Sequence, residues 1–180
     1  MGGVPDRVIL WGFMASGKTA VGGEVADRLA WEHADLDVEI VRSAGREISD
    51  IFATDGEPGF RALELEATRR LIDRDRVVLT PGGGWITNPA VRRLVPPSTL
   101  TVWLQVSPDV ALSRVAAEVG GAERPMLRGA DPLGTVRRLL EEREPLYRNA
   151  ALHVPTDGRT LEEIADQITA AVRAGWPGRK

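Results

Sequence analysis

The sequence has no cysteine among its 180 residues, and it has only two histidines. The lack of cysteine excludes a disulfide framework, a thiolate zinc site and a cysteine nucleophile. His33 and His153 stand alone, with neither a carboxylate nor a second histidine at metal-binding spacing. We therefore expect each histidine to be packed or at the surface, and the chemistry must come from other residue types.

Strong charge of one sign and long apolar runs are also missing. The formal net charge is −3 and the isoelectric point is near 5.5, so no basic field is available for a nucleic-acid partner. No apolar run approaches the roughly 18 residues of a membrane span, and the segment MGGVPDR lacks the basic and apolar regions of a signal peptide. These features predict one globular domain over residues 1–180, acting as a cytoplasmic monomer without a membrane partner.

Short β-type runs alternate with longer helical patterns along the chain. The runs are RVILW, VVLT, TLTVWLQV and ALHV, each followed by a turn signal. Such alternation is typical of an α/β fold in which helices cover a parallel sheet. The runs 8–11 and 100–104 are continuously apolar, which indicates central strands that are buried on both faces.

Two helices can be outlined from their start signals. Thr160 and Glu163 form a T-x-x-E capping box ahead of an apolar stripe at helical spacing. In the segment GEPGFRALELEATRRLI, Pro58 takes an early helical position. Arg61 and Glu64 follow as i,i+3 neighbours near the start of that helix.

The segment GFMASGKTAVG, residues 12–22, contains the pattern G-x-x-x-x-G-K-[ST]. It follows a strand and opens a helix, which is the context that this motif requires. In the motif, backbone N–H groups form a nest for phosphate, the lysine reaches the β- and γ-phosphates, and the hydroxyl binds Mg²⁺. We therefore expect the loop to bind ATP with Mg²⁺. The residues assigned to nucleotide binding are Gly12, Ala15, Ser16, Gly17, Lys18 and Thr19.

A phosphate-binding loop occurs in hydrolases and switches, in kinases, and in modules that only sense nucleotide. The stretch 120–134 has four glycines, two prolines and two arginines without periodicity, which predicts a mobile loop. Arginines on a closing loop compensate the charge of a phosphoryl group in transfer and exclude water. The small size of the chain and this loop favour a small-molecule kinase.

Polar or flexible residues follow two of the expected strands. Asp35 and Asp37 follow a strand end, where one carboxylate can lie near Mg²⁺ and the other can accept hydrogen bonds from hydroxyl groups. A capped helix start at Asp37 explains the same residues equally well. Gly82, Gly83 and Gly84 follow the strand VVLT, and they allow either a tight turn or close approach of a ligand to the backbone.

Arg61 and Arg143 can be explained without a ligand, by ion pairs with nearby acidic residues. Arg61 can pair with Glu64 on a solvated helix face, and Arg143 can pair with Glu141 or Glu142. Taken one at a time, these ion pairs explain both arginines without any ligand.

Taken together, these segments resemble the shikimate kinases, which are small P-loop kinases of the nucleoside monophosphate kinase fold. The segments GFMASGKTAVG, DLDVEI, GREISDIFATDGEPGFRALE, PGGG, ERPML and REPLY occur in the family's order and at about its spacing. The combination of D-x-D, G-E-x-x-F-R, G-G-G and R-x-P-L-Y is specific to that family, whereas the P-loop alone is widely shared.

The resemblance runs nearly end to end and implies both a fold and a reaction. The implied fold is a three-layer α/β/α arrangement with a five-stranded parallel sheet, a substrate-binding segment over 35–63 and a mobile lid over 119–131. The implied reaction is transfer of the γ-phosphoryl group of ATP to the 3-hydroxyl of shikimate, in aromatic amino-acid biosynthesis.

The resemblance also implies roles around the acceptor. Asp37 would accept hydrogen bonds from shikimate hydroxyls and be the candidate base near the 3-hydroxyl. Arg61 and Arg143 would hold the carboxylate, a task suited to the planar guanidinium fork. Glu64 would orient Arg61, and Gly83 would offer a backbone contact between its two glycine neighbours.

Further roles concern the nucleotide. Asp35 would hold Mg²⁺ through water, with Thr19 as the direct ligand. Arg124 would close on the phosphates from the lid and act with Lys18, and Arg114 would stack on adenine. The apolar wall of the acceptor pocket would consist of Ile51, Phe52 and Phe60.

Three positions depart from the family pattern. Ala15 stands where glycine is usual, so the loop loses backbone freedom. Gly23 replaces a larger, often basic residue, and Trp85 replaces a small residue directly after the triple glycine. We expect that Trp85 could narrow the acceptor pocket.

Two rival functions stay open from the sequence. A gluconate kinase would explain the phosphate loop and the lid, but it would not explain the triple glycine together with R-x-P-L-Y. A nucleotide-binding module that lost turnover and regulates a partner is supported only by Ala15 and Trp85.

Overall fold

The computed structural model describes residues 4–117 and 130–175. In it, five parallel strands form one sheet in the order β2-β3-β1-β4-β5. The strands are β1 (Arg7–Gly12), β2 (Glu32–Asp35), β3 (Val77–Thr80), β4 (Thr99–Gln105) and β5 (Leu152–Pro155). The helices are α1 (Lys18–Leu29), α2 (Leu36–Ala44), α3 (Ile48–Ile72), the 3₁₀ helix η1 (Trp85–Thr87), α4 (Pro89–Arg92), α5 (Pro108–Ala117), α6 (Pro132–Tyr147) and α7 (Leu161–Ala174). The α/β class and the five-stranded parallel sheet expected from the sequence are confirmed.

Strand β1 is the centre of the sheet. All six of its residues are buried, and it pairs with β3 on one side and with β4 on the other. Its continuous apolarity follows from this position, because helices cover both faces of a parallel sheet. The expectation that 8–11 and 100–104 are central strands is therefore confirmed.

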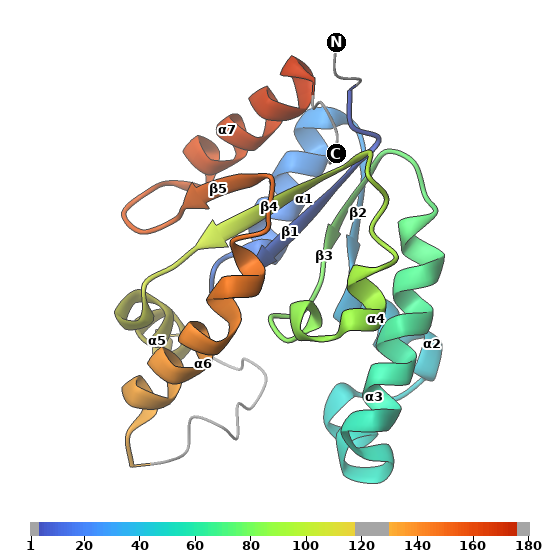
Figure 1. The fold of residues 1–180 in the computed structure, drawn as a ribbon, viewed down its shortest axis with the longest axis vertical. Helices are drawn as coiled ribbons and strands as arrows, with labels where there is room; N and C mark the ends of the chain where they lie inside the picture. The colour runs from blue at the N-terminus through green and yellow to red at the C-terminus, as the bar shows by residue number, and fades with distance from the viewer. Residues whose placement is uncertain (1–3, 118–129, 176–180) are drawn as a thin grey trace.

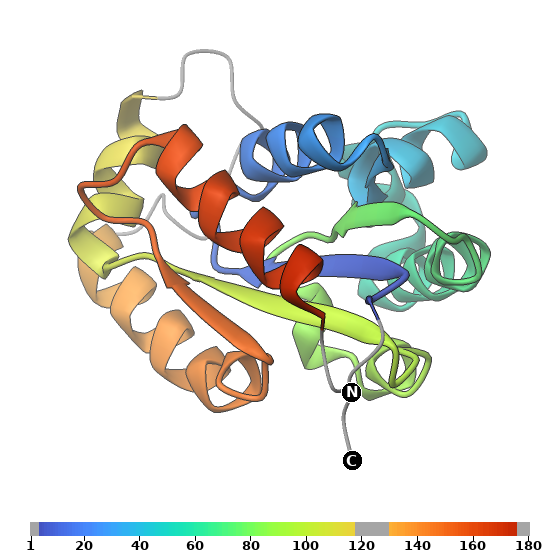
Figure 2. The same ribbon diagram turned by 90° about the horizontal axis from the view of Figure 1, so that it is seen from above.

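Helices cover the sheet on both faces, which makes three layers. Val8 and Leu10 of β1 pack with α1 and α7 in one apolar cluster, whereas Ile9 and Trp11 belong to a second cluster with α3, α4, α5 and α6. Figure 2 shows α1 and α7 on one side of the sheet and α4 and α6 on the other. The alternation along β1 thus divides the core in two.

The helix start signals hold in the structure. Thr160 and Glu163 form the expected capping box of α7. Helix α3 is broken at Gly56, whose φ of 67° and ψ of −173° are not helical, and the second part resumes immediately after it. Pro58 therefore lies at the start of a helical segment, as its fixed φ and missing N–H require.

The carboxyl ends of the strands form the functional edge of this fold. The chain places β2 and β3 on one side of β1 and places β4 and β5 on the other, so the loop after β1 lies where the strand order divides. Ligands of open α/β sheets bind at such a point. In Figure 1, α2 and part of α3 lie on one side of this edge, and α5 and α6 lie on the other.

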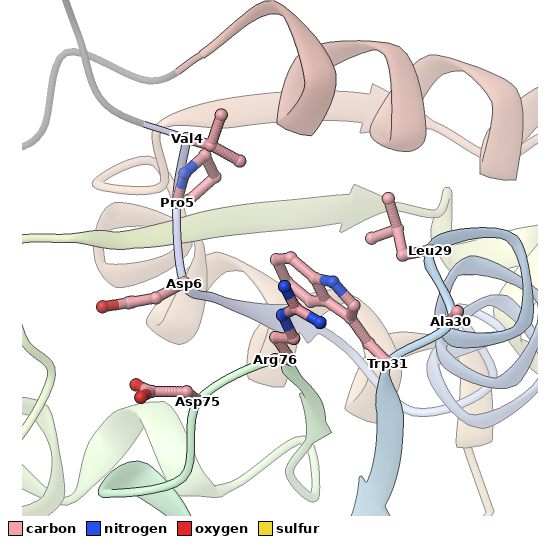
Figure 3. Close-up of a pocket in the computed structure, with 8 residues that line it drawn as sticks. All are labelled: Val4, Pro5, Asp6, Leu29, Ala30, Trp31, Asp75 and Arg76. Atoms are coloured by element: carbon pink, nitrogen blue, oxygen red, sulfur yellow. The ribbon is translucent and has the colours of Figure 1, made fainter.

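A hollow of about 460 Å³ lies at the opposite edge of the sheet. It is lined by residues 4–6, 29–31 and 75–76 (Figure 3). These three segments directly precede β1, β2 and β3, so the hollow lies at the amino ends of these strands. It contains none of the residues that the sequence singled out. In the part of the chain that the structure describes, no helix combines the length and the apolar character needed to cross a membrane.

The close packing of α1 on β3 generates a prediction with a matched control. A Cβ atom at Gly22 would overlap the Thr80 methyl group and lie 2.9 Å from His33 Nε2, whereas at Gly23 the nearest atom would be 3.7 Å away. Gly22→Ala should lower the free energy of unfolding by about 1–3 kcal/mol through overpacking. Gly23→Ala should raise it by about 0.5–1 kcal/mol, because alanine favours the helix. Urea unfolding followed by circular dichroism checks both, and equal stability of the two variants would contradict the packing argument.

Candidate active site

The loop between β1 and α1 has the backbone form of a phosphate nest. Gly17 lies in the left-handed region with φ 88° and precedes the first residue of α1. Ser16 N–H donates to the Phe13 carbonyl oxygen at 3.3 Å, which closes the turn. Lys18 Nζ donates to the carbonyl oxygens of Gly12 and Phe13 at 2.9 and 2.8 Å, so its ammonium group lies directly over the loop.

Ala15 keeps the conformation that glycine would take at its position. Its φ of 56° lies in the left-handed region, which costs an L-residue about 1–2 kcal/mol. Arg114 of α5 donates to the Ala15 carbonyl oxygen at 3.1 Å and to the Thr156 carbonyl oxygen at 3.3 Å. This arginine therefore ties the strained loop to the end of β5, while its role toward adenine stays a prediction. Arg124 lies outside the described residues, as does nearly all of the lid segment 119–131.

Two hydroxyl groups and one carboxylate converge beside the loop. The hydroxyl groups of Thr19 and Thr80 both donate to Asp35 Oδ2, at 2.8 and 3.3 Å. Asp35 Oδ1 accepts from the backbone N–H groups of Asp37 and Val38, so Asp35 is the N-cap of α2. The capped helix start considered for Asp37 is thus two residues earlier, at Asp35.

The oxygen atoms of Thr19 and Asp35 suit a hard cation such as Mg²⁺. Among the described residues, no group of three or more histidine, cysteine, aspartate or glutamate side chains could hold a metal ion by itself. Mg²⁺ in proteins usually keeps several water ligands and takes further oxygens from substrate phosphates.

The carboxyl group of Asp37 lies against the first residue of the triple glycine. A Cβ atom at Gly82 would lie 3.3 Å from each Asp37 carboxylate oxygen. Burial raises the pKa of Asp37 to about 6, the negative charge of Asp35 adds to the rise, and Lys18 opposes it. The group is therefore mostly ionised at pH 7, but close enough to neutrality to exchange a proton.

Arg61 is held by a network that starts on the same helix. Its Nη1 donates to Glu64 Oε1 and Oε2 at 3.2 and 3.0 Å and to the Gly84 carbonyl oxygen at 3.2 Å. The Glu64 side chain is only 3% exposed and also accepts from Asn88 Nδ2 at 3.3 Å. The ion pair expected between Arg61 and Glu64 is thus confirmed, and it is part of the site rather than of a solvated face.

Arg143 reaches the triple glycine from α6. Its Nη1 donates to the Gly83 carbonyl oxygen at 3.3 Å, and its guanidinium carbon lies 5.6 Å from the centre of the Phe13 ring. Tyr147 donates to the same carbonyl oxygen at 2.7 Å, and burial raises the pKa of Tyr147 to about 12, so its hydroxyl stays a donor at neutral pH. Within 4–117 and 130–175, no ion pair joins Arg143 to Glu141, Glu142 or another acid, so the simpler explanation of Arg143 is wrong.

Apolar residues border the acceptor side. Ile51 and Phe60 are buried, and Phe52, which is 43% exposed, stacks on Phe60 with ring centres 4.6 Å apart. Trp85 is only 1% exposed: its Nε1 donates to Thr68 Oγ1 at 3.0 Å and its ring lies 6.4 Å from that of Trp11. The expectation that Trp85 narrows the pocket is therefore wrong, because the side chain fills the core beneath the glycines.

His33 is half-buried and His153 lies at the surface, and both outcomes were expected. Nε2 of His33 lies 3.0 Å from Thr80 Oγ1, and burial lowers the pKa of His33 below its ordinary value. His153 meets the Trp103 ring edge-on at 5.2 Å between ring centres.

Sequence reasoning missed several polar residues that hydrogen-bond to candidate site residues. They are Glu57, Thr80, Thr87, Asn88, Tyr147 and Thr156. Glu57 and Tyr147 stood inside quoted motifs, so they could have been found there. The hydroxyl and amide residues carry no spacing signal, because their partners come from distant elements.

Comparisons with known proteins agree on one family. Residues 14–173 match the family model described as shikimate kinase. A shikimate kinase of Thermus thermophilus is 42% identical over 161 residues, which cover 89% of this chain and 86% of that protein. The structure of a shikimate kinase from Acinetobacter baumannii in complex with shikimate superposes with a TM-score of 0.85 at 33% identity, covering 94% of this chain and 93% of that one. A gluconokinase from Sinorhizobium meliloti, at 20% identity and a TM-score of 0.60 over 96% of this chain and 94% of its own, shares the fold alone.

The raised pKa of Asp37 generates a prediction about stability. Its folded-state pKa of about 6 exceeds the ordinary value of 3.8, so ionisation at higher pH opposes folding, whereas well below pH 3.8 the group is neutral in both states. Asp37→Asn should therefore raise the free energy of unfolding at pH 7.5 by about 1–3 kcal/mol. The gain should shrink as the pH falls through 6 toward 4. Denaturant unfolding at several pH values checks this, and a gain that grows on acidification would contradict the assigned cause.

Proposed function

The chain belongs to the shikimate kinase family, and from this premise we propose that it phosphorylates the 3-hydroxyl of shikimate with ATP, yielding shikimate 3-phosphate and ADP. The observation that carries the proposal is the convergence of Asp37, Arg61 and Arg143 on one triple-glycine backbone, whose Gly83 also lies against the P-loop backbone that Lys18 bonds to. Such a site can align an acceptor hydroxyl with a phosphate, which is most of what phosphoryl transfer requires. The reaction belongs to the shikimate pathway of aromatic amino-acid biosynthesis.

The nucleotide side is proposed from the loop and its neighbours. The backbone N–H groups of residues 15–19 and the Lys18 ammonium group would bind the phosphates of ATP. Thr19 would ligate Mg²⁺ directly and Asp35 would hold it through water, and the bound ion would neutralise charge on the phosphates. Arg114 and, from the lid, Arg124 complete this proposed set.

The acceptor side is proposed around Asp37. As the acceptor oxygen attacks the γ-phosphorus, a new O–P bond forms, the bond to the bridging oxygen breaks, and ADP leaves. Asp37 accepts the hydroxyl proton, for which a pKa of about 6 is well suited near neutral pH. In a loose transition state, this carboxylate also fixes the direction of the hydroxyl.

The acceptor carboxylate is assigned to the two arginines. Arg61 and Arg143 rest on the adjacent carbonyl groups of Gly84 and Gly83, so their guanidinium groups approach the same stretch of backbone from α3 and α6. Planar guanidinium groups bind a carboxylate through parallel hydrogen bonds, which fix orientation as well as position. We also propose that the enzyme is a monomer and acts in the cytoplasm.

The direct test is ADP release in a coupled assay with ATP and Mg²⁺. Shikimate should stimulate release strongly, and the product should gain the mass of one phosphoryl group. Gluconate is the control acceptor. ADP release with gluconate alone would favour the gluconate kinase, and intact ATP binding without turnover of either acceptor would favour a regulatory module.

The role of Asp37 generates a kinetic prediction. Asp37→Asn should lower kcat by about 10²–10⁴-fold, because the amide cannot accept the proton, while the affinity for ATP stays close to that of the parent enzyme. In the parent enzyme, kcat/KM for shikimate should rise with pH through about 6 and then level off. Steady-state kinetics and nucleotide titration check both parts. An unchanged kcat in the variant would remove Asp37 from the chemistry.

A further inference from the structure

The guanidinium group of Arg61 has an acceptor at every nitrogen. Nη1 faces Glu64 and the Gly84 carbonyl group, as described above. On the other edge, Nε and Nη2 both donate to Glu57 Oε1 at 3.3 Å, and Nη2 also donates to Thr87 Oγ1 at 3.2 Å. The substrate-binding arginine is therefore already paired on both edges.

Arg143 differs in this respect. It contacts a carbonyl oxygen and an aromatic ring, and no acidic side chain pairs with it in the ranges that the structure describes. Of the two arginines assigned to the acceptor carboxylate, Arg61 is covered by carboxylates, whereas Arg143 contacts no carboxylate of residues 4–117 and 130–175.

The two carboxylates on Arg61 are not equivalent. Glu64 is 3% exposed, makes the shorter contacts and is fixed by Asn88, so displacing it from Arg61 would leave its own buried carboxylate without that cation. Glu57 is 68% exposed, uses one oxygen and makes only 3.3 Å contacts. An exposed pair of this kind is weak, and its carboxylate can return to water at little cost.

The edge that Glu57 covers is an edge that suits a ligand. Nε and Nη2 form one of the two parallel-donor edges through which arginine binds a carboxylate side-on. A third carboxylate cannot join Glu57 and Glu64 around one guanidinium group without strong repulsion. An arriving carboxylate therefore has to displace one of them, and the exposed one is the easier to displace.

We propose that Glu57 is a placeholder for the acceptor carboxylate: it occupies the Nε/Nη2 edge of Arg61 in the free enzyme and is displaced when the acceptor binds. This inference rests on the proposed function and adds a specificity residue to it. Competition with Glu57 lowers the affinity for the acceptor. It also disfavours acceptors without a carboxylate, since they gain nothing from a guanidinium group that is already paired.

The spacing of Glu57 and Arg61 in the sequence favours their contact in the helix. In G-E-x-x-F-R, Glu57 and Arg61 stand at i,i+4 with the acid on the amino-terminal side, which is the favourable order in a helix. Glu57 comes directly after the break at Gly56, so it belongs to the first turn of the resumed helix. No other part of the proposed chemistry uses this residue.

The test compares shikimate binding to the parent enzyme and to Glu57→Gln by titration calorimetry at low salt. The variant keeps the size of the side chain and removes its charge, so the Kd for shikimate should fall by about two- to five-fold. In steady-state kinetics the change should appear in the KM for shikimate, and neither kcat nor the KM for ATP should follow it. Glu57→Ala should shift the Kd in the same direction.

Glu66→Gln is the matched control on the same helix. Glu66 is 66% exposed and forms an i,i+4 ion pair of 3.9 Å with Arg70, away from the glycines, and its replacement should leave the Kd for shikimate unchanged. An unchanged Kd in Glu57→Gln would overturn the placeholder, and a raised Kd would show instead that Glu57 supports Arg61. Failure of the proposed function is recognised separately, because the parent enzyme itself would then neither bind nor phosphorylate shikimate.

Discussion

The backbone of Gly82, Gly83 and Gly84 is the point on which the site depends, because three functional groups lie against it without any intervening side chain. Added Cβ atoms would lie 3.3 Å from the Asp37 carboxylate at Gly82, 3.3 Å from the Met14 nitrogen of the P-loop at Gly83, and 3.5 Å from Arg61 at Gly84. Each of these distances is close to or below normal van der Waals contact. A side chain at Gly82 or Gly83 would press on the Asp37 carboxylate or on the phosphate loop, whereas one at Gly84 would make ordinary contact with Arg61.

The same backbone also organises the charges. Its carbonyl groups accept from Arg61, Arg143 and Tyr147, so both arginines are anchored on the same stretch of backbone, and Arg61 is also paired with Glu57 and Glu64. Behind it, Trp85 fills the core and donates to Thr68, which explains how a bulky residue follows the glycines without entering the pocket. The buried Trp85 side chain thus supports the backbone to which the polar groups are bonded.

Asp37 shows how the surroundings change the acidity of one carboxyl group, in the direction that suits the proton-accepting role that we propose. Burial and the nearby Asp35 raise its pKa, while Lys18 limits the rise. The rise and its limit both come from the surroundings of the Asp37 carboxyl group, because Asp35 lies on β2 and Lys18 on α1. Ala15 is likewise affected by a distant group: its backbone is in a left-handed conformation, and Arg114 of α5 donates to its carbonyl oxygen.

By itself the sequence determined the fold class, the central strands, the helix starts at Thr160 and near Pro58, and the family, since these depend on local periodicity, fixed φ angles and motif spacing. It also indicated the paired Arg61 and Glu64, which lie one helical turn apart. Only the tertiary structure decided that Asp35 caps α2 while accepting from Thr19 and Thr80, that Trp85 points into the core, and that Arg143 has no acidic partner in the described chain. Those outcomes depend on groups that come together from separate strands and helices. The order of residues along the chain does not show which of these distant groups a side chain will contact.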